Sequence, residues 1–242
     1  MNTESSPFVV TTFYKFVELA DAESLRARIF KICIQQKIKG TVLLAHEGIN
    51  ATITGSRVAI DKFYEFIKSV AELADVEFKE SLAASIPFRK LKVKVRKEIV
   101  TFKRKLNMQA TGTYLNAQAW DEMLRQKKTL VIDARNDYEV IFGTFKDAID
   151  PKTRNFTDLP EWVERNLRDI DRNQPIAMFC TGGIRCEKST AYMKQIGFKN
   201  VYHLKGGILQ YLETTKNKNN MWQGKCFVFD DRIALDSDLE AI

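Results

Sequence analysis

The sequence is poor in the residues that form disulfides and metal sites, and it has no long apolar run. Only four cysteines and two histidines occur among 242 residues. Four cysteines are too few for a disulfide-stabilised secreted scaffold, so we expect free thiols in a reducing cytoplasm. No apolar run approaches the roughly 18 residues of a membrane span, and the first residues lack the basic and apolar regions of a secretion signal. We therefore expect no membrane association and no bound metal.

The positive charge of the chain is confined to its first half. The net charge is +7, yet residues 1–110 carry 19 Lys and Arg against 12 Asp and Glu, whereas residues 111–242 carry 19 of each kind. We name nine cations of this half the basic set: Arg89, Lys90, Lys92, Lys94, Arg96, Lys97, Lys103, Arg104 and Lys105. A nucleic-acid backbone is the natural partner for such a concentration, although charge alone also allows another acidic partner.

Part of the basic set lies in a segment that alternates apolar and basic residues. Residues 91–96 read Leu-Lys-Val-Lys-Val-Arg. A strand with this pattern buries one face and presents three cations on the other. We favour RNA binding for these cations; the alternative is a charged edge strand that discourages aggregation.

The first 105 residues predict a basic ferredoxin-like α+β domain. Asp21 and Ser56 stand where N-caps of two helices are expected. Apolar periodicity and β-branched residues place the strands and helices, at 8–17, 21–36, 41–45, 49–54, 56–70 and 76–81. The order β-α-β-β-α-β is that of a sheet with two helices on one face.

The second half predicts a different, more regular α/β domain. Residues 106–113 are polar and form the expected linker, residues 114–224 the domain, and residues 225–242 a C-terminal tail. Short apolar strands alternate with helices, with strands expected at 130–133, 176–179 and 201–204 and helices at 116–124, 159–167, 187–195 and 207–214. This alternation indicates a mainly parallel sheet covered by helices on both faces.

A cysteine at the end of one predicted strand is the main candidate for chemistry. The strand at 176–179 leads into Cys180-Thr181-Gly182-Gly183-Ile184-Arg185-Cys186. Ligands of parallel sheets lie beyond the carboxyl ends of the strands, where Cys180 falls. Unpaired N–H groups and the dipole of the next helix favour negative charge there, which lowers a thiol pKa below about 8.5. We predict a reactive Cys180; the alternative is a buried cysteine beside a tight turn.

The neighbours of Cys180 define what the loop accommodates. Gly182 and Gly183 permit close backbone approach and positive φ, and Arg185 is expected to neutralise an anion, with a surface ion pair as the alternative. The C-x4-R spacing is one residue shorter than the C-x5-R of cysteine phosphatases, and Phe179 replaces their usual histidine. Both features argue against phosphate-ester hydrolysis, and the shorter loop suits a sulfur-sized group, such as a persulfide.

Three further residues have supporting or alternative roles. Cys186 either resolves a Cys180 persulfide as a disulfide or only packs. We expect Asp133 and Arg135 to brace the loop rather than to react. The two histidines, His46 and His203, fall in different predicted domains, so we do not expect them to share an iron ion.

Several segments together resemble a rhodanese domain, and the whole chain resembles the rhodanese-domain tRNA uridine hydroxylases. The resemblance to a rhodanese domain lies in residues 132–135, Tyr138-Glu139, the Cys180 loop and residues 203–207. The resemblance of the whole chain to the hydroxylases lies in residues 40–50, 94–100, 112–115, 133–139, 143–146, 148–153 and 178–188. Many members of this group continue into a cysteine-containing region, whereas this chain ends at Ile242, and we expect any function located there to be missing.

The resemblance implies an RNA-modifying enzyme. The implied reaction is oxygen-dependent 5-hydroxylation of the wobble uridine of tRNA, with Cys180 as the persulfide-forming cysteine. The implied partner is the anticodon arm of tRNA, and not DNA. No cofactor motif is evident in the sequence. The resemblance implies molecular oxygen as co-substrate, together with an electron donor that the sequence does not identify. The alternatives are a rhodanese-type sulfurtransferase, which moves sulfane sulfur to a thiol or a tRNA-modification acceptor, and a non-enzymatic RNA-binding module.

Overall fold

A computed structural model of the chain describes residues 7–216 and 220–241, in two compact units. The first unit runs to Thr101 and also contains Asp230–Arg232, and the second comprises Phe102–Phe229 and the residues from Ile233 onward. The last three cations of the basic set therefore belong to the second unit. Within the described residues, no helix combines the length and apolar character needed to cross a membrane.

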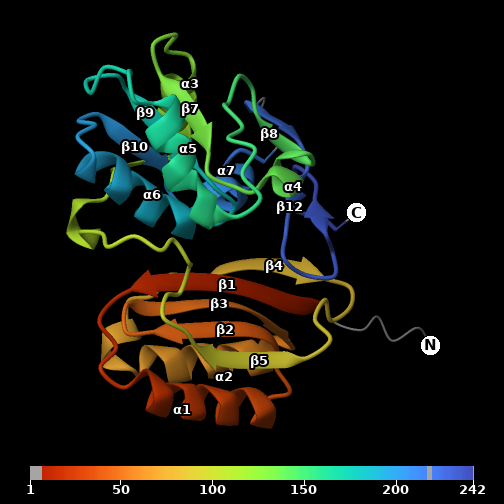
Figure 1. Cartoon of the computed structure of the whole chain (residues 1–242). Helices are drawn as coiled ribbons and strands as arrows, with labels where there is room; N and C mark the ends of the chain where they lie inside the picture. The colour runs from red at the N-terminus through yellow and green to blue at the C-terminus, as the bar shows by residue number, and fades with distance from the viewer. Residues whose placement is uncertain (1–6, 217–219, 242) are drawn as a thin grey trace. The chain divides into compact units, whose positions relative to one another are not determined.

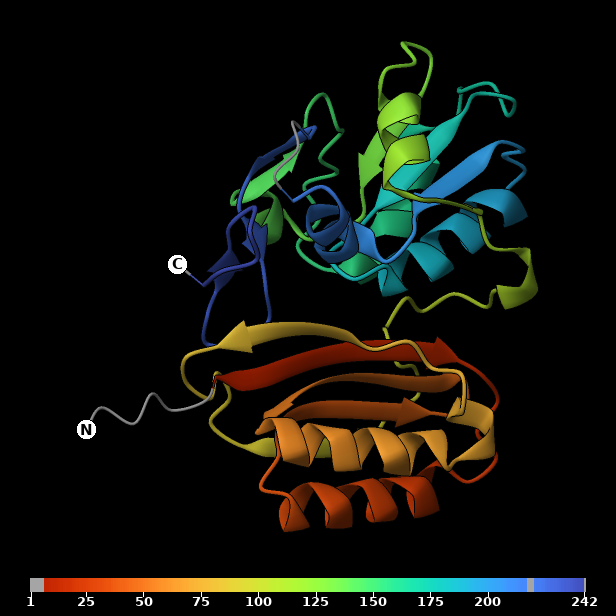
Figure 2. The same cartoon turned by 180° about the vertical axis from the view of Figure 1, so that it is seen from behind.

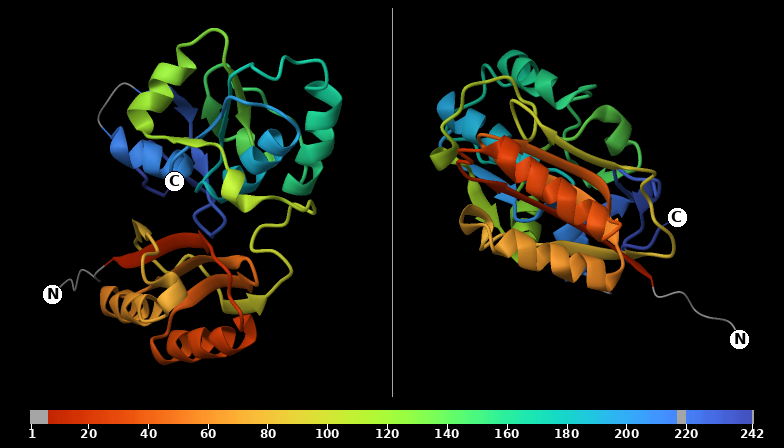
Figure 3. Two further views of the ribbon diagram at one scale, coloured as in Figure 1. Left: turned by 90° about the vertical axis from the view of Figure 1, so that its left-hand side faces the viewer. Right: turned by 90° about the horizontal axis from the view of Figure 1, so that it is seen from below.

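The first unit is a five-stranded sheet with two helices on one face (Figures 1 and 3). Its strands lie in the order β4-β1-β3-β2-β5, and only β5 runs parallel to its neighbour. The elements are β1 (Phe8–Phe16), α1 (Ala22–Gln35), β2 (Lys39–Ala45), β3 (Gly48–Gly55), α2 (Arg57–Lys68), the 3-10 turn η1 (Ala71–Leu73), β4 (Lys79–Ala83) and β5 (Leu91–Val95). This arrangement confirms the predicted ferredoxin-like fold.

Local sequence signals explain most of these boundaries. The Asp21 carboxylate accepts the Ser24 N–H at 2.8 Å, and the Ser56 hydroxyl accepts the Ala59 N–H at 3.3 Å, so both helices begin at their predicted caps. The last expected strand begins three residues late. Val76 is buried and its N–H bonds the Leu73 carbonyl, so a tight turn occupies the start of that segment.

The second unit is built on a four-stranded parallel sheet in the order β6-β10-β9-β7. Helices α5 and α6 cover one face and α3 and α7 the other (Figures 1 and 2). Its elements up to α7 are η2 (Met108–Ala110), β6 (Thr113–Leu115), α3 (Ala117–Leu124), β7 (Leu130–Asp133), α4 (Asp137–Val140), β8 (Gly143–Phe145), η3 (Phe156–Asp158), α5 (Leu159–Asn166), β9 (Ile176–Phe179), α6 (Ile184–Gln195), β10 (Val201–Leu204) and α7 (Gly207–Thr214). The parallel sheet with two covered faces is confirmed.

Short antiparallel pairs complete the second unit. Strand β11 (Trp222–Gly224) pairs with β8, and β12 (Cys226–Phe227) pairs with β13 (Ala234–Leu235). The residues expected as a tail therefore contain a small hairpin. In Figure 1, α4, β8 and β12 lie together at one side of this unit.

Helix α6 begins three residues earlier than the sequence predicts. Gly183 is its N-cap and has a left-handed backbone with φ 100°, which turns the chain directly from β9 into the helix. Consequently Ile184 and Arg185, predicted as loop residues, stand in the first helical turn. The true loop is only Cys180–Gly183.

Candidate active site around Cys180

Cys180 is held by backbone donors at the start of α6. Its side chain is fully buried directly after β9. The Gly183 N–H donates to Cys180 Sγ at 3.2 Å, and the N–H groups of Arg185 and Cys186 also hydrogen-bond the sulfur. Converging N–H groups at a helix N-terminus stabilise an anion, so the site favours a thiolate.

The surroundings lower the pKa of Cys180 to about 6. Burial by itself raises the pKa, because a charged sulfur loses its hydration. A hydrogen bond from the Cys186 thiol, the positive charge of Arg185 and the backbone donors outweigh that penalty. The other three cysteines behave oppositely: burial raises the pKa of Cys33 and of Cys226 to about 12, and the pKa of Cys186 well above its usual value.

Helix α7 fastens the Cys180 loop from the other side. The Ile208 and Leu209 N–H groups donate to the carbonyls of Cys180 and Thr181 at 3.0 and 3.1 Å. Gly207, with φ 68°, permits this approach, since a Cβ there would lie 2.4 Å from the Cys180 carbonyl oxygen.

The two glycines of the loop differ from each other. At Gly182, φ is not left-handed and a Cβ would meet nothing within 4 Å. Positive φ, predicted for both loop glycines, therefore applies to Gly183 only.

Arg185 is buried and paired with a carboxylate that the sequence did not single out as a site residue. Its guanidinium donates to both Glu139 oxygens, at 2.5 and 2.7 Å, and its side chain is only 8% exposed. The surface ion pair considered for Arg185 is therefore wrong. Thr181 Oγ1 also donates to Glu139, at 3.3 Å, so one carboxylate orients two residues of the predicted loop.

Glu139 is the residue that sequence reasoning missed. Burial raises the pKa of its carboxyl group, but the charge and hydrogen bonds of Arg185 hold that pKa below its usual range. Its Oε1 also accepts the Asn136 N–H at 3.1 Å. The Asn-x-x-Glu spacing of a capping box signals this last bond, but no local signal predicts the pairing with Arg185, which lies 46 positions later.

Asp133 and Arg135 form a second buried ion pair. Arg135 Nε and Nη2 donate to the two Asp133 oxygens, at 2.9 and 2.5 Å. Arg135 Nη2 also donates to the Gly143 carbonyl at 2.6 Å, and Thr144 Oγ1 donates to Asp133 at 2.9 Å. These bonds brace the segment from α4 to β8, which in turn carries Glu139.

The basic set is exposed but is not one continuous stripe of one unit. Lys92, Lys94 and Arg96 are exposed on or next to β5, which is an edge strand. The alternation places their side chains opposite the helix-covered face. This position agrees with both hypotheses for these cations, RNA binding and a charged edge strand that discourages aggregation. In the second unit, Arg104 Nη2 lies 4.0 Å from a Glu164 oxygen.

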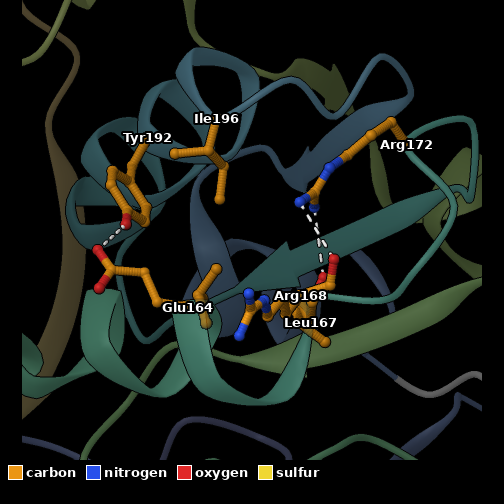
Figure 4. Close-up of a pocket in the computed structure, with 7 residues that line it drawn as sticks. Glu164, Leu167, Arg168, Arg172, Tyr192 and Ile196 are labelled. Carbon is orange, nitrogen blue, oxygen red and sulfur yellow. Dashed lines mark hydrogen bonds between the residues drawn. The ribbon is translucent and has the colours of Figure 1, made fainter.

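A pocket of about 330 Å³ in the second unit contains none of the predicted site residues (Figure 4). The Tyr192 hydroxyl donates to Glu164 at 2.6 Å, and Arg172 donates to the Leu167 and Arg168 carbonyls at 3.3 Å. The pocket is lined by Val163, Glu164, Leu167, Arg168, Arg172, Tyr192 and Ile196. Its polar rim is thus occupied by internal hydrogen bonds, and we do not assign it to the reaction.

Among residues 7–216 and 220–241, no group of three His, Cys, Asp or Glu side chains is placed to hold a metal ion. His46 is exposed and lies 3.5 Å from Glu18. His203 is buried with its ring 4.2 Å from that of Tyr114, and burial lowers its pKa to about 4. The Glu47 carboxylate accepts the Ile99 N–H at 2.8 Å, which gives this turn residue a bracing role.

Known proteins match both units. Residues 8–99 match the profile of the UPF0176 acylphosphatase like domain, and residues 116–214 match that of the Rhodanese-like domain. Among solved structures, a rhodanese-related protein from Thermoplasma volcanium is 22% identical and covers 44% of this chain and 95% of its own, with a TM-score of 0.35.

Relatives of similar length extend the match along nearly the whole chain. A tRNA uridine(34) hydroxylase of Wolbachia pipientis wMel is 52% identical over 233 residues, which is 96% of this chain and 84% of the relative. One of Legionella pneumophila (strain Corby) is 48% identical over 236 residues, 97% of this chain and 92% of the relative. Identity of this extent across both units shows that the chain belongs to the family of the rhodanese-domain tRNA uridine(34) hydroxylases.

Proposed function

We propose that this protein is an oxidoreductase that hydroxylates C5 of the wobble uridine of tRNA with molecular oxygen, in the cytoplasm. The observation that carries the proposal is a thiolate site at Cys180 in a chain about half identical to proteins named tRNA uridine(34) hydroxylase. Cys180 is the catalytic residue, in thiolate or persulfide form. Arg185 and Glu139 act as positioning residues that keep the sulfur charged.

The reaction replaces the C5–H bond of uracil by C5–OH. One oxygen atom enters the base, and the other leaves as water after accepting two electrons and two protons. An electron donor must therefore take part beside molecular oxygen. At pH 7 a thiol with a pKa of about 6 is mostly ionised, so Cys180 is available as a nucleophile without a separate base.

The basic set supports tRNA as the substrate. Its cations would contact phosphates of the anticodon arm, because backbone neutralisation supplies most of the affinity for RNA. The wobble base would leave the stack of the anticodon loop to reach the site, as single-stranded bases in loops readily do.

The test is hydroxylation by the purified full chain. Bulk tRNA from a strain lacking the gene, incubated with isotopically labelled oxygen gas and a reductant, should gain labelled 5-hydroxyuridine, detected by mass spectrometry of the nucleosides. Cys180→Ala should abolish the product, whereas Cys33→Ala, which removes a buried cysteine of the first unit, should retain it. Product formation by Cys180→Ala would overturn the role of the thiolate.

Sulfur transfer is the second candidate, and one observation favours it. The N–H groups that surround Cys180 Sγ equally suit the terminal sulfur of a persulfide. If the protein is a sulfurtransferase, it should convert thiosulfate and cyanide to thiocyanate at an enzymatic rate, and the oxygen-labelling experiment should give no product.

A further inference from the structure

Aromatic side chains gather beside the Arg185–Glu139 ion pair in the second unit. The Phe227 ring makes edge-on contacts with Tyr138 at 5.5 Å and with Phe229 at 5.1 Å between centroids. Phe142, in the turn between α4 and β8, packs against Phe227 with 5.5 Å between ring centroids. We name Tyr138, Phe227 and Phe229 the aromatic patch.

The patch is open to solvent although it is apolar. Phe229 is 59% exposed and Tyr138 is 41% exposed, while Phe227 is partly buried beneath them. Phe227 lies in β12, which pairs with β13, and Tyr138 lies in α4, while Phe229 follows two residues after Phe227. Exposed aromatic rings that cluster in this way mark a binding surface rather than a core.

The patch is continuous with the reactive site. The centroid of the Phe229 ring lies 5.8 Å from the Arg185 guanidinium carbon. Tyr138 immediately precedes Glu139, to which Arg185 donates two hydrogen bonds. Arg185 in turn supplies the charge that stabilises the Cys180 thiolate. The rings are therefore connected to the Cys180 site through the Arg185–Glu139 ion pair.

We propose that the aromatic patch is the stacking site for the extruded wobble uracil. This inference rests on the proposed function, because it names where the substrate base binds. Protein surfaces that read unstacked bases commonly do so by stacking them on Phe or Tyr rings, which tolerate any base through its π-face. The patch has both rings and exposure.

Cations flank the patch, as a phosphate backbone requires. Lys225 is exposed, and its N–H bonds the Phe142 carbonyl at 2.7 Å. On the other side, the Asp137 N–H bonds the Thr153 carbonyl at 2.9 Å, and the neighbours of Thr153, Lys152 and Arg154, are exposed. Acids lie here as well: the Asp137 carboxylate accepts the Tyr138 N–H, and Asp230, which follows Phe229, is paired with Arg232. The exposed cations Lys225, Lys152 and Arg154 thus offer contacts for phosphates beside the rings.

The direct test is photocrosslinking with the full chain. A tRNA transcript carrying a single 5-iodouridine at the wobble position is irradiated in complex with the protein, and the crosslinked peptide is mapped by mass spectrometry. We expect attachment to Tyr138, Phe227 or Phe229. The control transcript carries the 5-iodouridine in its acceptor stem. A crosslink elsewhere, or none from a tRNA that is bound, overturns the patch and leaves the proposed function intact; a tRNA that is not bound overturns both.

Rates distinguish stacking from a purely structural role. Phe229→Ala should lower kcat/KM for tRNA about fivefold to a hundredfold, the equivalent of one lost stacking contact. Phe229→Tyr should restore the rate and Phe229→Leu should not. The matched control is Phe30→Ala, which removes an aromatic side chain of the first unit that is 42% exposed, and it should act as wild type. If the patch takes a protein partner instead, the wobble-position crosslink maps elsewhere and Phe229→Ala leaves the tRNA rate unchanged, and that outcome also overturns the proposal.

Discussion

Cys180 has a low pKa because several weak contributions act together against burial. The Cys186 thiol, the Arg185 charge and backbone N–H groups lower this pKa. Arg185 can serve a buried thiolate only because Glu139 compensates its own charge, since an unpaired buried cation costs several kcal/mol. The reactive residue thus depends on a carboxylate 41 positions earlier in the chain.

Titration of the thiols should show a single ionisation near pH 6. Cys33, Cys186 and Cys226 ionise only at far higher pH, so the ultraviolet absorbance change in this range reports Cys180. The thiolate should be present above the midpoint and lost as the pH falls below it. Cys186→Ala should raise the midpoint toward about 8.5, because the thiolate loses a hydrogen bond. An unchanged midpoint in that variant would show that the Cys186 thiol does not contribute.

The Cys180 loop is shaped by the two helices that flank it. Helix α6 offers its first N–H groups to the sulfur, and α7 binds the carbonyls of Cys180 and Thr181. The sequence predicted β7, β9, β10 and α7 to the residue, because continuous apolar runs and glycine boundaries are local signals. It placed the start of α6 three residues too late: positive φ was expected at Gly183, but only the folded turn makes Gly183 the N-cap of the helix.

Two glycine substitutions should show which glycine the stability of this loop depends on. Gly207→Ala should lower the free energy of unfolding by about 2–4 kcal/mol, because a Cβ would meet the Cys180 carbonyl at a positive φ. Gly182→Ala should change it by less than about 0.5 kcal/mol, since a Cβ there stands in open space. Urea unfolding measures both. Equal losses in the two variants would contradict the assigned roles.

Across the whole molecule, charge and chemistry are distributed over both units. The first unit carries Arg89 to Lys97 of the basic set, whereas Lys103, Arg104 and Lys105 belong to the unit that holds Cys180. Family membership explains why the Cys180 loop and a basic ferredoxin-like unit occur in one chain.

The salt dependence of tRNA binding should report the edge strand β5. Replacing Lys92, Lys94 and Arg96 simultaneously by Gln should make the plot of log binding constant against log salt concentration less steep by about two to three. Each phosphate contact that is lost means that fewer counterions are released on binding. The matched control is a triple replacement of Lys31, Lys62 and Lys68 on α1 and α2, on the opposite face of the sheet. If replacing Lys92, Lys94 and Arg96 leaves the slope unchanged, these cations only discourage edge pairing.

The order of strands and helices, the two-domain plan, the uneven charge and the position of Cys180 after a strand are all readable from the amino-acid sequence. These features depend on periodicity, composition and short spacing, which are local properties. The burial of Arg185, its pairing with Glu139, the bracing of the loop by α7 and the aromatic patch join residues far apart in the chain. Only the tertiary structure decides them, because burial and ion pairing depend on which distant segments the fold brings into contact.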